Sequence, residues 1–260
     1  IGNTECYLCE YDEGRHGGAI DIWFSSRGAS SHPLIERKYK RWLHTCPRWF
    51  GQMVMEVNRL SVGGERHEAA SEQFDRDIHN LWEKHGPHIG FTASEERRGQ
   101  KLLRSLGIPQ GAKWVCLIVR DSAYLKAAAP GQNFSYHDHR DSDISSYAHA
   151  AVELVRKGYY VIRMGKVVER QMPVRHTRII DYPFYKQQSD FGQLYLGAKC
   201  EFCFGASTGF MAIPQVFGRP TVVVNFVPLE YISTWCKGLV IWKHHVKDGK
   251  RMTLAEIINC

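Results

Sequence analysis

The second part of the chain is an ordered alternation of short apolar segments and segments with helical spacing. From residue 114 onward, apolar runs of strand length recur, and most are separated by a stretch whose apolar side chains follow helical periodicity. The predicted strands are 114–119, 159–163, 178–182, 200–204, 221–226 and 239–243, and the predicted helices are 144–157, 191–198, 210–217 and 253–259. Apolar strands joined by single helices indicate right-handed crossovers and a parallel sheet covered on both faces. We therefore predict an α/β fold containing a Rossmann-like domain.

The first 90 residues differ in composition and are rich in Arg, His, Trp and Glu. The elements predicted up to the start of the alternation are a strand at 19–24, helices at 33–43, 71–84 and 94–106, and a linker at 85–92. Gly86, Pro87 and Gly90 mark that linker, because glycine and proline interrupt regular structure. We predict two domains, residues 1–90 and residues 91–260.

Composition limits the class of protein and of partner. The chain has 260 residues, of which 43% are hydrophobic and 23% charged, as in folded globular proteins. Its apolar runs are far shorter than the roughly 20 residues of a membrane-spanning helix. The 34 Lys and Arg outnumber the 27 Asp and Glu, which gives a net charge of +7. Such an excess favours an anionic partner, whether nucleic acid, a phosphorylated small molecule or an acidic membrane surface.

The eight cysteines are too sparse for a disulfide scaffold, so we predict mostly reduced thiols. Cys6 with Cys9, and Cys200 with Cys203, have the spacing of zinc-ligand pairs. In a strand at 200–204, however, Cys200 and Cys203 would face opposite sides of the sheet. We favour buried structural thiols over a zinc site.

Cationic and small residues follow several of the predicted strands. In an open parallel sheet, ligands bind beyond the carboxyl ends of the strands. The residues predicted at this edge are Arg120 and Asp121 after the first strand, Arg163, Gly165 and Lys166 at the second, and Ser207, Thr208 and Gly209 after the fourth. Their chemistry suits phosphate, although strand-end arginines also form local ion pairs and a small-residue turn also serves as a helix cap. The usual dinucleotide and P-loop signatures are absent.

The loop at 136–143 is the densest polar cluster of the chain. Its His-x-His-x-Asp order resembles the start of a binuclear zinc hydrolase motif, but Ser142 stands where a further histidine continues that motif. A second reading makes Asp141 or Asp143 the cap of the following helix. A third places the loop at a ligand cleft, with His137 or Asp138 as a base and Arg140 as a phosphate clamp. We favour the second and third together.

Asp190 precedes the helix at 191–198 and has two readings of its own. It is expected to be the N-cap of that helix, since aspartate is favoured there. The alternative is a contact with a ligand hydroxyl or base edge.

Several segments together resemble a family of bacterial glycosyltransferases of GT-B type that act in surface polysaccharide biosynthesis. The resemblance covers residues 91–259 and rests on the segments 106–109, 115–125, 136–144, 158–165, 189–209 and 224–229. It implies two Rossmann-like domains flanking a cleft, with the nucleotide-sugar donor on the C-terminal domain. The opening residues 1–4 resemble the turn after the first strand of the N-terminal domain, so we expect that domain to be truncated here.

A more distant resemblance links Arg120 and the stretch 189–209 to motifs of fucosyltransferases. It implies that Arg120, Ser207, Thr208 and Gly209 bind the donor diphosphate and that Asp190 contacts the nucleotide. Where the fucosyltransferase motif has a histidine ahead of the arginine, this chain has Ile118.

The residues and the resemblance lead to one predicted function. We predict metal-independent transfer of a sugar, with no cofactor, from a nucleotide-sugar to a bacterial surface glycan or lipid-linked glycan. The predicted catalytic residues are Arg120, Asp121, His137 and Asp138, and the predicted donor-binding residues are Arg140, Arg163, Gly165, Lys166, Asp190, Ser207, Thr208 and Gly209. The expected location is cytoplasmic, with peripheral association at the inner face of the membrane as an option. No specific nucleic-acid partner is expected.

Two alternatives stay open. A nucleotide-sugar epimerase or hydrolase of the same fold would consume the donor without an acceptor. A module that binds sugar or nucleic acid would retain the fold without catalysis.

Overall fold

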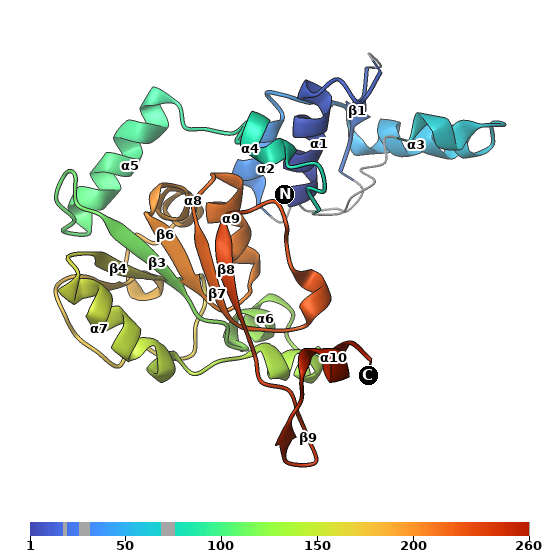
Figure 1. Cartoon of the computed structure of the whole chain (residues 1–260). Helices are drawn as coiled ribbons and strands as arrows, with labels where there is room; N and C mark the ends of the chain where they lie inside the picture. Colours follow the sequence, from blue (N-terminus) through green and yellow to red (C-terminus); the bar gives the residue numbers. More distant parts are fainter. Residues whose placement is uncertain (18–19, 26–31, 69–75, 260) are drawn as a thin grey trace. The chain divides into compact units, whose positions relative to one another are not determined.

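A computed structural model describes residues 1–17, 20–25, 32–68 and 76–259 (Figure 1). The chain divides into two compact units. Unit 1 consists of Ile1–Glu95, Val216–Gly218 and Ser233–Cys236, and unit 2 consists of Glu96–Gln215, Arg219–Ile232 and Lys237–Cys260. The domain boundary predicted at residue 90 stays a prediction.

Unit 2 is built on a six-stranded sheet in which every neighbouring pair of strands is parallel. Its strands are β3 (Trp114–Ile118), β4 (Tyr160–Met164), β5 (Ile179–Asp181), β6 (Phe202–Gly205), β7 (Thr221–Phe226) and β8 (Gly238–Trp242). They lie in the order β5-β4-β3-β6-β7-β8. The predicted α/β fold with a parallel sheet is confirmed.

Most connections of unit 2 are helical, as predicted. The helices are α5 (Ala93–Ser105), α6 (Ala123–Ala128), α7 (Ala148–Arg156), α8 (Asp190–Lys199), α9 (Ala212–Val216) and α10 (Leu254–Ile258), and a hairpin is formed by β9 (Val246–Lys247) and β10 (Lys250–Arg251). The helices predicted at 144–157 and 210–217 each open as a 3-10 turn, at Ile144–Tyr147 and Gly209–Met211. Strand β6 starts at Phe202 rather than at residue 200, because Cys200 is the C-cap of α8.

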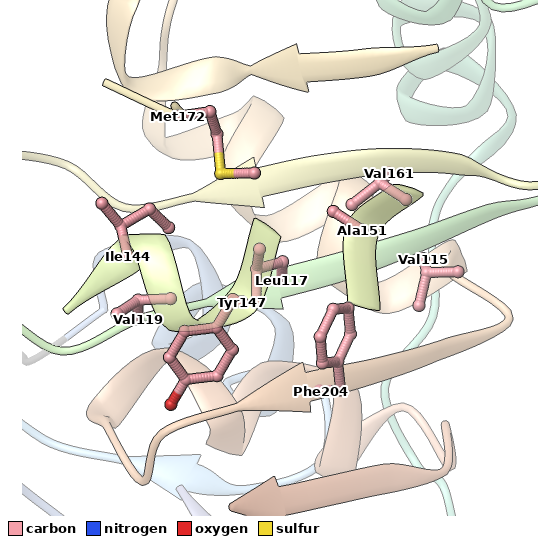
Figure 2. Close-up of a cluster of buried hydrophobic side chains, with 9 residues drawn as sticks. All are labelled: Val115, Leu117, Val119, Ile144, Tyr147, Ala151, Val161, Met172 and Phe204. Atoms are coloured by element: carbon pink, nitrogen blue, oxygen red, sulfur yellow. The ribbon is translucent and has the colours of Figure 1, made fainter. Parts of the chain in front are cut away.

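Strand β3 is buried along its whole length and carries the core of unit 2 on both of its faces. Figure 2 shows Val115, Leu117 and Val119 packed with Tyr147 and Ala151, so α7 covers this face. This cluster also contains Ile144, Val161, Met172 and Phe204. On the other face, the Trp114 indole donates a hydrogen bond to the Leu196 carbonyl at 3.0 Å, which places α8 there.

Three cysteines lie in this second layer, each with no exposed surface: Cys116, Cys200 and Cys203. The Cys116 thiol donates to the Leu196 carbonyl at 3.4 Å, and the Cys200 thiol to the Gly197 carbonyl at 3.1 Å. Burial raises the pKa of Cys116 and of Cys203 well above the ordinary value, so both stay protonated. The geometry is that of buried structural thiols. The expectation that Cys200 and Cys203 face opposite sides of the sheet was wrong, because Cys200 is the C-cap of α8 and lies outside β6.

Unit 1 is mostly helical. Its elements are α1 (Gly2–Asp12), β1 (Ile22–Trp23), α2 (Pro33–Tyr39), β2 (His44–Thr45), α3 (Arg48–Arg59), a 3-10 turn at Gly64–His67 and α4 (Leu81–His85). Strands β1 and β2 pair in parallel, with Ile22 opposite His44. The strand expected at 19–24 is confirmed only as β1, and its first residue lies outside the described residues. The helix expected at 33–43 ends at Tyr39.

The helix expected at 71–84 is confirmed over 81–84 and was wrong over 76–80, since α4 begins only at Leu81. Residues 71–75 lie outside the described residues. The Asp77 carboxylate accepts the backbone N–H groups of Leu81 and Trp82, both at 2.8 Å. Asn80 has a left-handed φ of 53°. A carboxylate that captures backbone donors in this way sets the start of a helix and competes with helix upstream of it.

Among the described residues, no helix combines the length and the apolar character needed to cross a bilayer.

Candidate functional site

The carboxyl ends of β3 and β6 form the topological switch point of the sheet. After β3 the chain builds β4 and β5 on one side, and it then returns to place β6 on the other side of β3. Gly205, the last residue of β6, fits here because it has no side chain: its φ is 135°, and a Cβ would lie 1.8 Å from the Ile118 carbonyl oxygen. The next residue, Ala206, donates its N–H to that oxygen at 2.8 Å. Loops at such a switch point are where ligands bind in open α/β sheets.

Two guanidinium groups come together at this switch point. Arg120 directly follows Val119 at the end of β3, and Arg140 ends the 3-10 turn Ser135–Arg140. Arg140 Nη2 donates to the Ser207 carbonyl at 3.4 Å, which ties the turn to the loop after β6. Burial lowers the pKa of Arg140, and the positive charge of Arg120 lowers it further. The structure thus brings Arg120, Arg140 and Ser207, predicted from three separate segments, to one place.

Hydrogen-bond donors at this place lack acceptors. The Arg120 Nε, Arg140 Nε and Thr208 Oγ1 atoms are buried and have no hydrogen-bond partner among the described residues. Asp141 Oδ1 forms an ion pair with Arg120 Nε at 3.2 Å, but the two groups are not aligned for a hydrogen bond, so this buried oxygen also lacks a hydrogen-bond partner. Buried donors without acceptors are costly unless a ligand or water supplies them. The site therefore has the chemistry to receive an anion with several oxygen acceptors.

Arg163 is placed differently from the expectation of a cation at the sheet edge. Its side chain is only 1% exposed, and Nη1 lies 3.3 Å from Asp181 Oδ1. The same guanidinium donates to the Arg170 carbonyl, and Nη2 lies 3.7 Å from Asp121 Oδ2. Arg163 is thus held between two carboxylates inside the fold.

Asp121 is likewise engaged in holding loops. Its carboxylate accepts the N–H groups of Ala123 and of Glu169, both at 3.1 Å. These bonds join the loop after β3 to the loop after β4. Asp121, predicted as a catalytic residue, therefore holds these two loops in position.

Gly165, Lys166 and Asp190 lie together at the end of β4. The Gly165 carbonyl accepts hydrogen bonds from the side-chain amides of Gln188 at 2.7 Å and Gln193 at 2.6 Å. Lys166 Nζ pairs with Asp190 Oδ1 at 3.0 Å, with both side chains more than half exposed. The expectation that Asp190 is an N-cap was wrong. Ser189 caps α8, since its hydroxyl accepts the Gly192 N–H at 3.1 Å.

The two remaining catalytic candidates differ in surroundings. His137 is half-buried, whereas Asp138 is exposed. Burial lowers the pKa of His137, and the charges of Arg120 and Arg140 lower it further. A histidine with a lowered pKa is neutral at neutral pH and can accept a proton. Of the two aspartates expected as a cap, Asp143 has that role, because its side chain accepts the Ser145 N–H at 2.9 Å.

A cavity of about 310 Å³ adjoins these residues between the ends of β3 and β4. Its polar lining consists of the carboxylates Asp121, Asp141, Asp143 and Glu169, the hydroxyls Ser122 and Ser142, and the guanidiniums Arg163 and Arg170. Carboxylates accept hydrogen bonds from hydroxyl groups, and serine hydroxyls both donate and accept them, so this lining suits a polyhydroxy ligand.

Several supporting residues were missed by the sequence reasoning. Asp181, Gln188 and Gln193 hold Arg163 and Gly165, yet none belongs to a recognisable motif. Asp181 had a partial signal, because it lies near the carboxyl end of the strand predicted at 178–182, but its pairing with Arg163 depends on the strand order. The two glutamines had none.

The described residues contain one group with a set of possible metal donors, and it lies in unit 1: Glu5, Cys9 and His88, all buried. These donors are already hydrogen-bonded. Glu5 Oε1 accepts the His88 N–H at 2.7 Å and lies 2.7 Å from His88 Nδ1, and Glu5 Oε2 accepts the Tyr39 hydroxyl at 2.6 Å. A metal ion would have to replace these contacts, so we describe the group as a buried polar cluster.

No protein-family model and no curated protein matches this sequence. Two solved structures are similar. The glycosyl transferase family 9 protein from Veillonella parvula DSM 2008 is 15% identical with a TM-score of 0.44, over 59% of this chain and 42% of that one. The E. coli ADP-heptose LPS heptosyltransferase II is 12% identical with a TM-score of 0.50, over 95% of this chain and 87% of that one.

At such identities the similarity is one of fold. The second structure covers nearly the whole chain, and it agrees with the parallel sheet and the helices described above. The heptosyltransferase structure is not a fucosyltransferase, so the more distant resemblance gains no support from it. The chain has the α/β fold of GT-B glycosyltransferases.

Proposed function

We propose that the protein is a glycosyltransferase that moves a sugar from a nucleotide-sugar to a glycan acceptor. The observation that carries this proposal is the pair Arg120 and Arg140, whose buried Nε atoms lack acceptors at the switch point of the sheet. Two neighbouring guanidiniums repel each other, and a bound diphosphate would relieve the repulsion while accepting their hydrogen bonds.

The same pair supplies the chemistry of the transfer. As the sugar leaves, negative charge develops on the diphosphate, and fixed cations stabilise that charge without reorganising. In this proposal Arg120 and Arg140 take the role that a metal ion has elsewhere, so the reaction proceeds without one. Ser207, Thr208 and Gly209 complete the diphosphate contacts, with the Thr208 hydroxyl as the unpartnered donor.

The residues at the end of β4 have supporting roles. Lys166 and Asp190, which pair at 3.0 Å on the surface, are proposed to contact the nucleotide. Gly165 keeps the backbone close to them. Arg163 and Asp121 contribute by holding the two loops rather than by contacting the phosphates, because both are already bonded inside the fold.

A transfer that inverts configuration needs a base for the acceptor hydroxyl. We assign this role to His137, whose lowered pKa keeps it unprotonated at neutral pH. Asp138 is the second candidate and lies next to it on the same 3-10 turn. The adjoining cavity of about 310 Å³, lined by carboxylates and hydroxyls, is proposed to receive the donor sugar.

The acceptor is proposed to be a bacterial surface glycan or a lipid-linked glycan. The support is the resemblance of residues 91–259 and a GT-B fold similar to that of a lipopolysaccharide heptosyltransferase. The proposed site of action is the cytoplasm.

The decisive measurement is donor binding by thermal shift with ADP-, UDP-, GDP-, CMP- and dTDP-linked sugars. A ligand at about 100 times its Kd stabilises a protein by about 2.7 kcal/mol, which is roughly 5–10 °C for a domain of this size. The Arg120→Ala variant should lose about 10- to 100-fold in affinity, because a charge-assisted hydrogen bond is removed. Lys113→Ala is the matched control. Lys113 directly precedes the start of β3, at the edge of the sheet opposite the proposed site, and its exposed ammonium group pairs with Glu201 at 3.5 Å.

Three outcomes decide the proposal. Unchanged donor binding by Arg120→Ala would refute the assigned diphosphate site. Consumption of the donor without an acceptor would make the protein an epimerase or hydrolase instead. Intact donor after long incubation, together with tight glycan or RNA binding, would leave a non-catalytic binding module.

A further inference from the structure

The cavity between the ends of β3 and β4 has more negative than positive groups in its lining. Its volume is about 310 Å³, and its ionisable side chains are Asp121, Asp141, Asp143, Glu169, Arg163 and Arg170. Four carboxylates against two guanidiniums leave a formal excess of two negative charges. Because the cavity adjoins the proposed diphosphate site, this charge bears on the kind of sugar that it can hold.

The guanidiniums of the lining have little capacity left for an anionic ligand. Arg163 donates from Nη1 to the Arg170 carbonyl, and the same atom lies 3.3 Å from Asp181 Oδ1. Its Nη2 atom lies 3.7 Å from Asp121 Oδ2. The side chain of Arg170 is exposed. A carboxylate brought into the cavity would therefore meet one exposed guanidinium and four carboxylates.

Two buried polar atoms of the lining residues have no hydrogen-bond partner among the residues that the structure describes. They are Asp141 Oδ1, which is an acceptor, and Arg163 Nε, which is a donor on a side chain only 1% exposed. Buried polar groups of this kind are completed by water or by a ligand. A hydroxyl group completes both, since it donates to a carboxylate and accepts from a guanidinium. The lining is therefore suited to a ligand with several hydroxyl groups.

The rest of the wall is apolar and belongs to the core. Val119 and Ile144 line the cavity, and both are members of the buried cluster on β3 that Figure 2 shows. Such a wall packs against the C–H groups of a sugar ring, but it supplies no partner for a charge. Since burying a charge without a partner is costly, the apolar wall also disfavours a charged sugar.

Asp141 connects the cavity to the proposed diphosphate site. It lines the cavity, and its Oδ1 atom forms the 3.2 Å ion pair with Arg120 Nε. In a nucleotide-sugar the sugar is bonded directly to the outer phosphate, so a diphosphate on Arg120 brings the sugar next to Asp141. Burial raises the pKa of Asp141, the positive charge of Arg120 acts against this, and neighbouring carboxylates raise it again. A further anion beside Asp141 is therefore unfavourable.

We propose that this cavity selects a donor sugar without a carboxylate group, and that Asp141 determines the specificity by accepting a hydroxyl of the sugar. The inference rests on the proposed function and adds to it the chemical class of the sugar. A sugar acid would be repelled by the carboxylates of the lining, because like charges brought together oppose binding. A protonated amine at the same place would be attracted to them.

The test measures how the sugar changes the affinity of a nucleoside diphosphate. Calorimetric titration with ADP, UDP, GDP and dTDP first identifies the one that binds the full chain most tightly. Glucose, glucuronic acid and glucosamine are then compared as conjugates of that nucleotide. We expect the glucuronic acid conjugate to bind at least about tenfold more weakly than the glucose conjugate, and the glucosamine conjugate to bind at least as tightly as the glucose conjugate. Galactose and galacturonic acid form a second pair, which separates charge from stereochemistry.

The variant Asp141→Asn removes the charge and keeps the shape of the side chain. Because Asp141 also pairs with Arg120, each Kd is divided by that of the nucleoside diphosphate alone, which cancels effects on the phosphate contacts. The penalty for the sugar acid should fall at least about threefold in Asp141→Asn, and further in Asp141→Asn/Glu169→Gln. Glu153→Gln on α7 is the matched control, since it removes a carboxylate from a surface pair with Arg156 and should leave the penalty unchanged. Circular dichroism establishes that each variant is folded.

The outcomes distinguish this inference from the proposed function. Binding of the conjugates that does not depend on the charge of the sugar would overturn the inference and leave the diphosphate site intact. A penalty for the sugar acid that is equal in the wild type and in Asp141→Asn/Glu169→Gln would overturn the role of the carboxylates in the lining. Binding of none of the four nucleoside diphosphates would refute the diphosphate site itself, and the inference with it.

Discussion

Arg163 and Asp181 are directly opposed on the neighbouring strands β4 and β5, and their side chains meet at 3.3 Å inside the fold. The same aspartate accepts the Met172 N–H at 2.8 Å, so it fixes the segment between the two strands as well. A buried charge pair of this kind is a positioning device at the edge of the proposed site.

Removing Asp181 should therefore destabilise the protein strongly. Asp181→Ala leaves the Arg163 guanidinium buried with only a distant carboxylate, and breaking a buried pair costs about 3–5 kcal/mol. Urea unfolding followed by circular dichroism measures this loss. Glu153→Ala is the control, because its 2.9 Å pair with Arg156 lies on the surface and should be worth less than about 1 kcal/mol. Equal losses in the two variants would contradict the buried-pair interpretation.

Arg140→Met should separate stability from donor binding. Without a ligand, the Arg140 guanidinium is disfavoured by the positive charge of Arg120 and keeps an unpartnered Nε, so its removal should change the free energy of unfolding by less than about 1 kcal/mol. The thermal shift caused by a nucleotide-sugar should be lost in the same variant. A loss of more than about 2 kcal/mol without ligand would instead make Arg140 a structural residue.

Gly205→Ala tests the close approach of β6 to β3. The added methyl group would overlap the Ile118 carbonyl oxygen at 1.8 Å, and the φ of 135° suits only glycine. We expect a loss of more than about 3 kcal/mol in urea unfolding. Gly131→Ala is the control, since Gly131 also has a positive φ, 85°, but has open space around it. This control should lose only about 1 kcal/mol, and similar losses in both would argue against the steric account.

The buried cluster in unit 1 should make stability depend on pH. Burial lowers the pKa of His88, but hydrogen bonds to the carboxylates of Glu5 and Asp12 raise it by more, and the net shift is upward. A raised pKa in the folded state contributes stability that is complete below the unfolded pKa of about 6.5 and is lost as the pH rises through the folded value.

Urea midpoints measured from pH 5.5 to 8.5, a range chosen to bracket the histidine titration at about 6.5, should show this decline. The His88→Gln variant should have a lower midpoint at acid pH and a flatter dependence. His149→Gln, at an exposed position of α7, serves as the comparison. A wild-type midpoint that rises over this range would contradict the account.

The sheet of unit 2 was predictable because its central strands β3, β4 and β6 are buried over most of their length. Every residue of β3 is apolar and every residue is buried, so the unbroken apolar run in the sequence matches the burial in the structure. The same logic placed Arg120 and Ser207 at one edge, since the carboxyl ends of parallel strands meet there. The spacing of apolar residues did not predict the helix boundaries where a side chain accepts hydrogen bonds from the backbone. Asp77 set the start of α4, and Ser189 rather than its neighbour Asp190 capped α8.

The fine structure of the site was beyond the sequence. Whether Arg163 faces solvent or the interior depends on Asp181 in the adjacent strand, and strand order is a tertiary property. The meeting of Arg120 with Arg140 depends on a 3-10 turn whose composition predicts only a polar loop. Local patterns therefore identified the charged residues, and packing decided their partners.

The buried thiols of Cys116, Cys200 and Cys203 can report how often the sheet opens. Alkylating reagents attack thiolates, and these three groups are sealed between β3, β6 and α8. They will be modified only when that layer separates, whereas Cys46 and Cys236, which are partly exposed, will react earlier. Mass spectrometry after timed alkylation therefore measures the rate at which this part of the sheet opens, and the measurement can be made with and without a bound nucleotide-sugar.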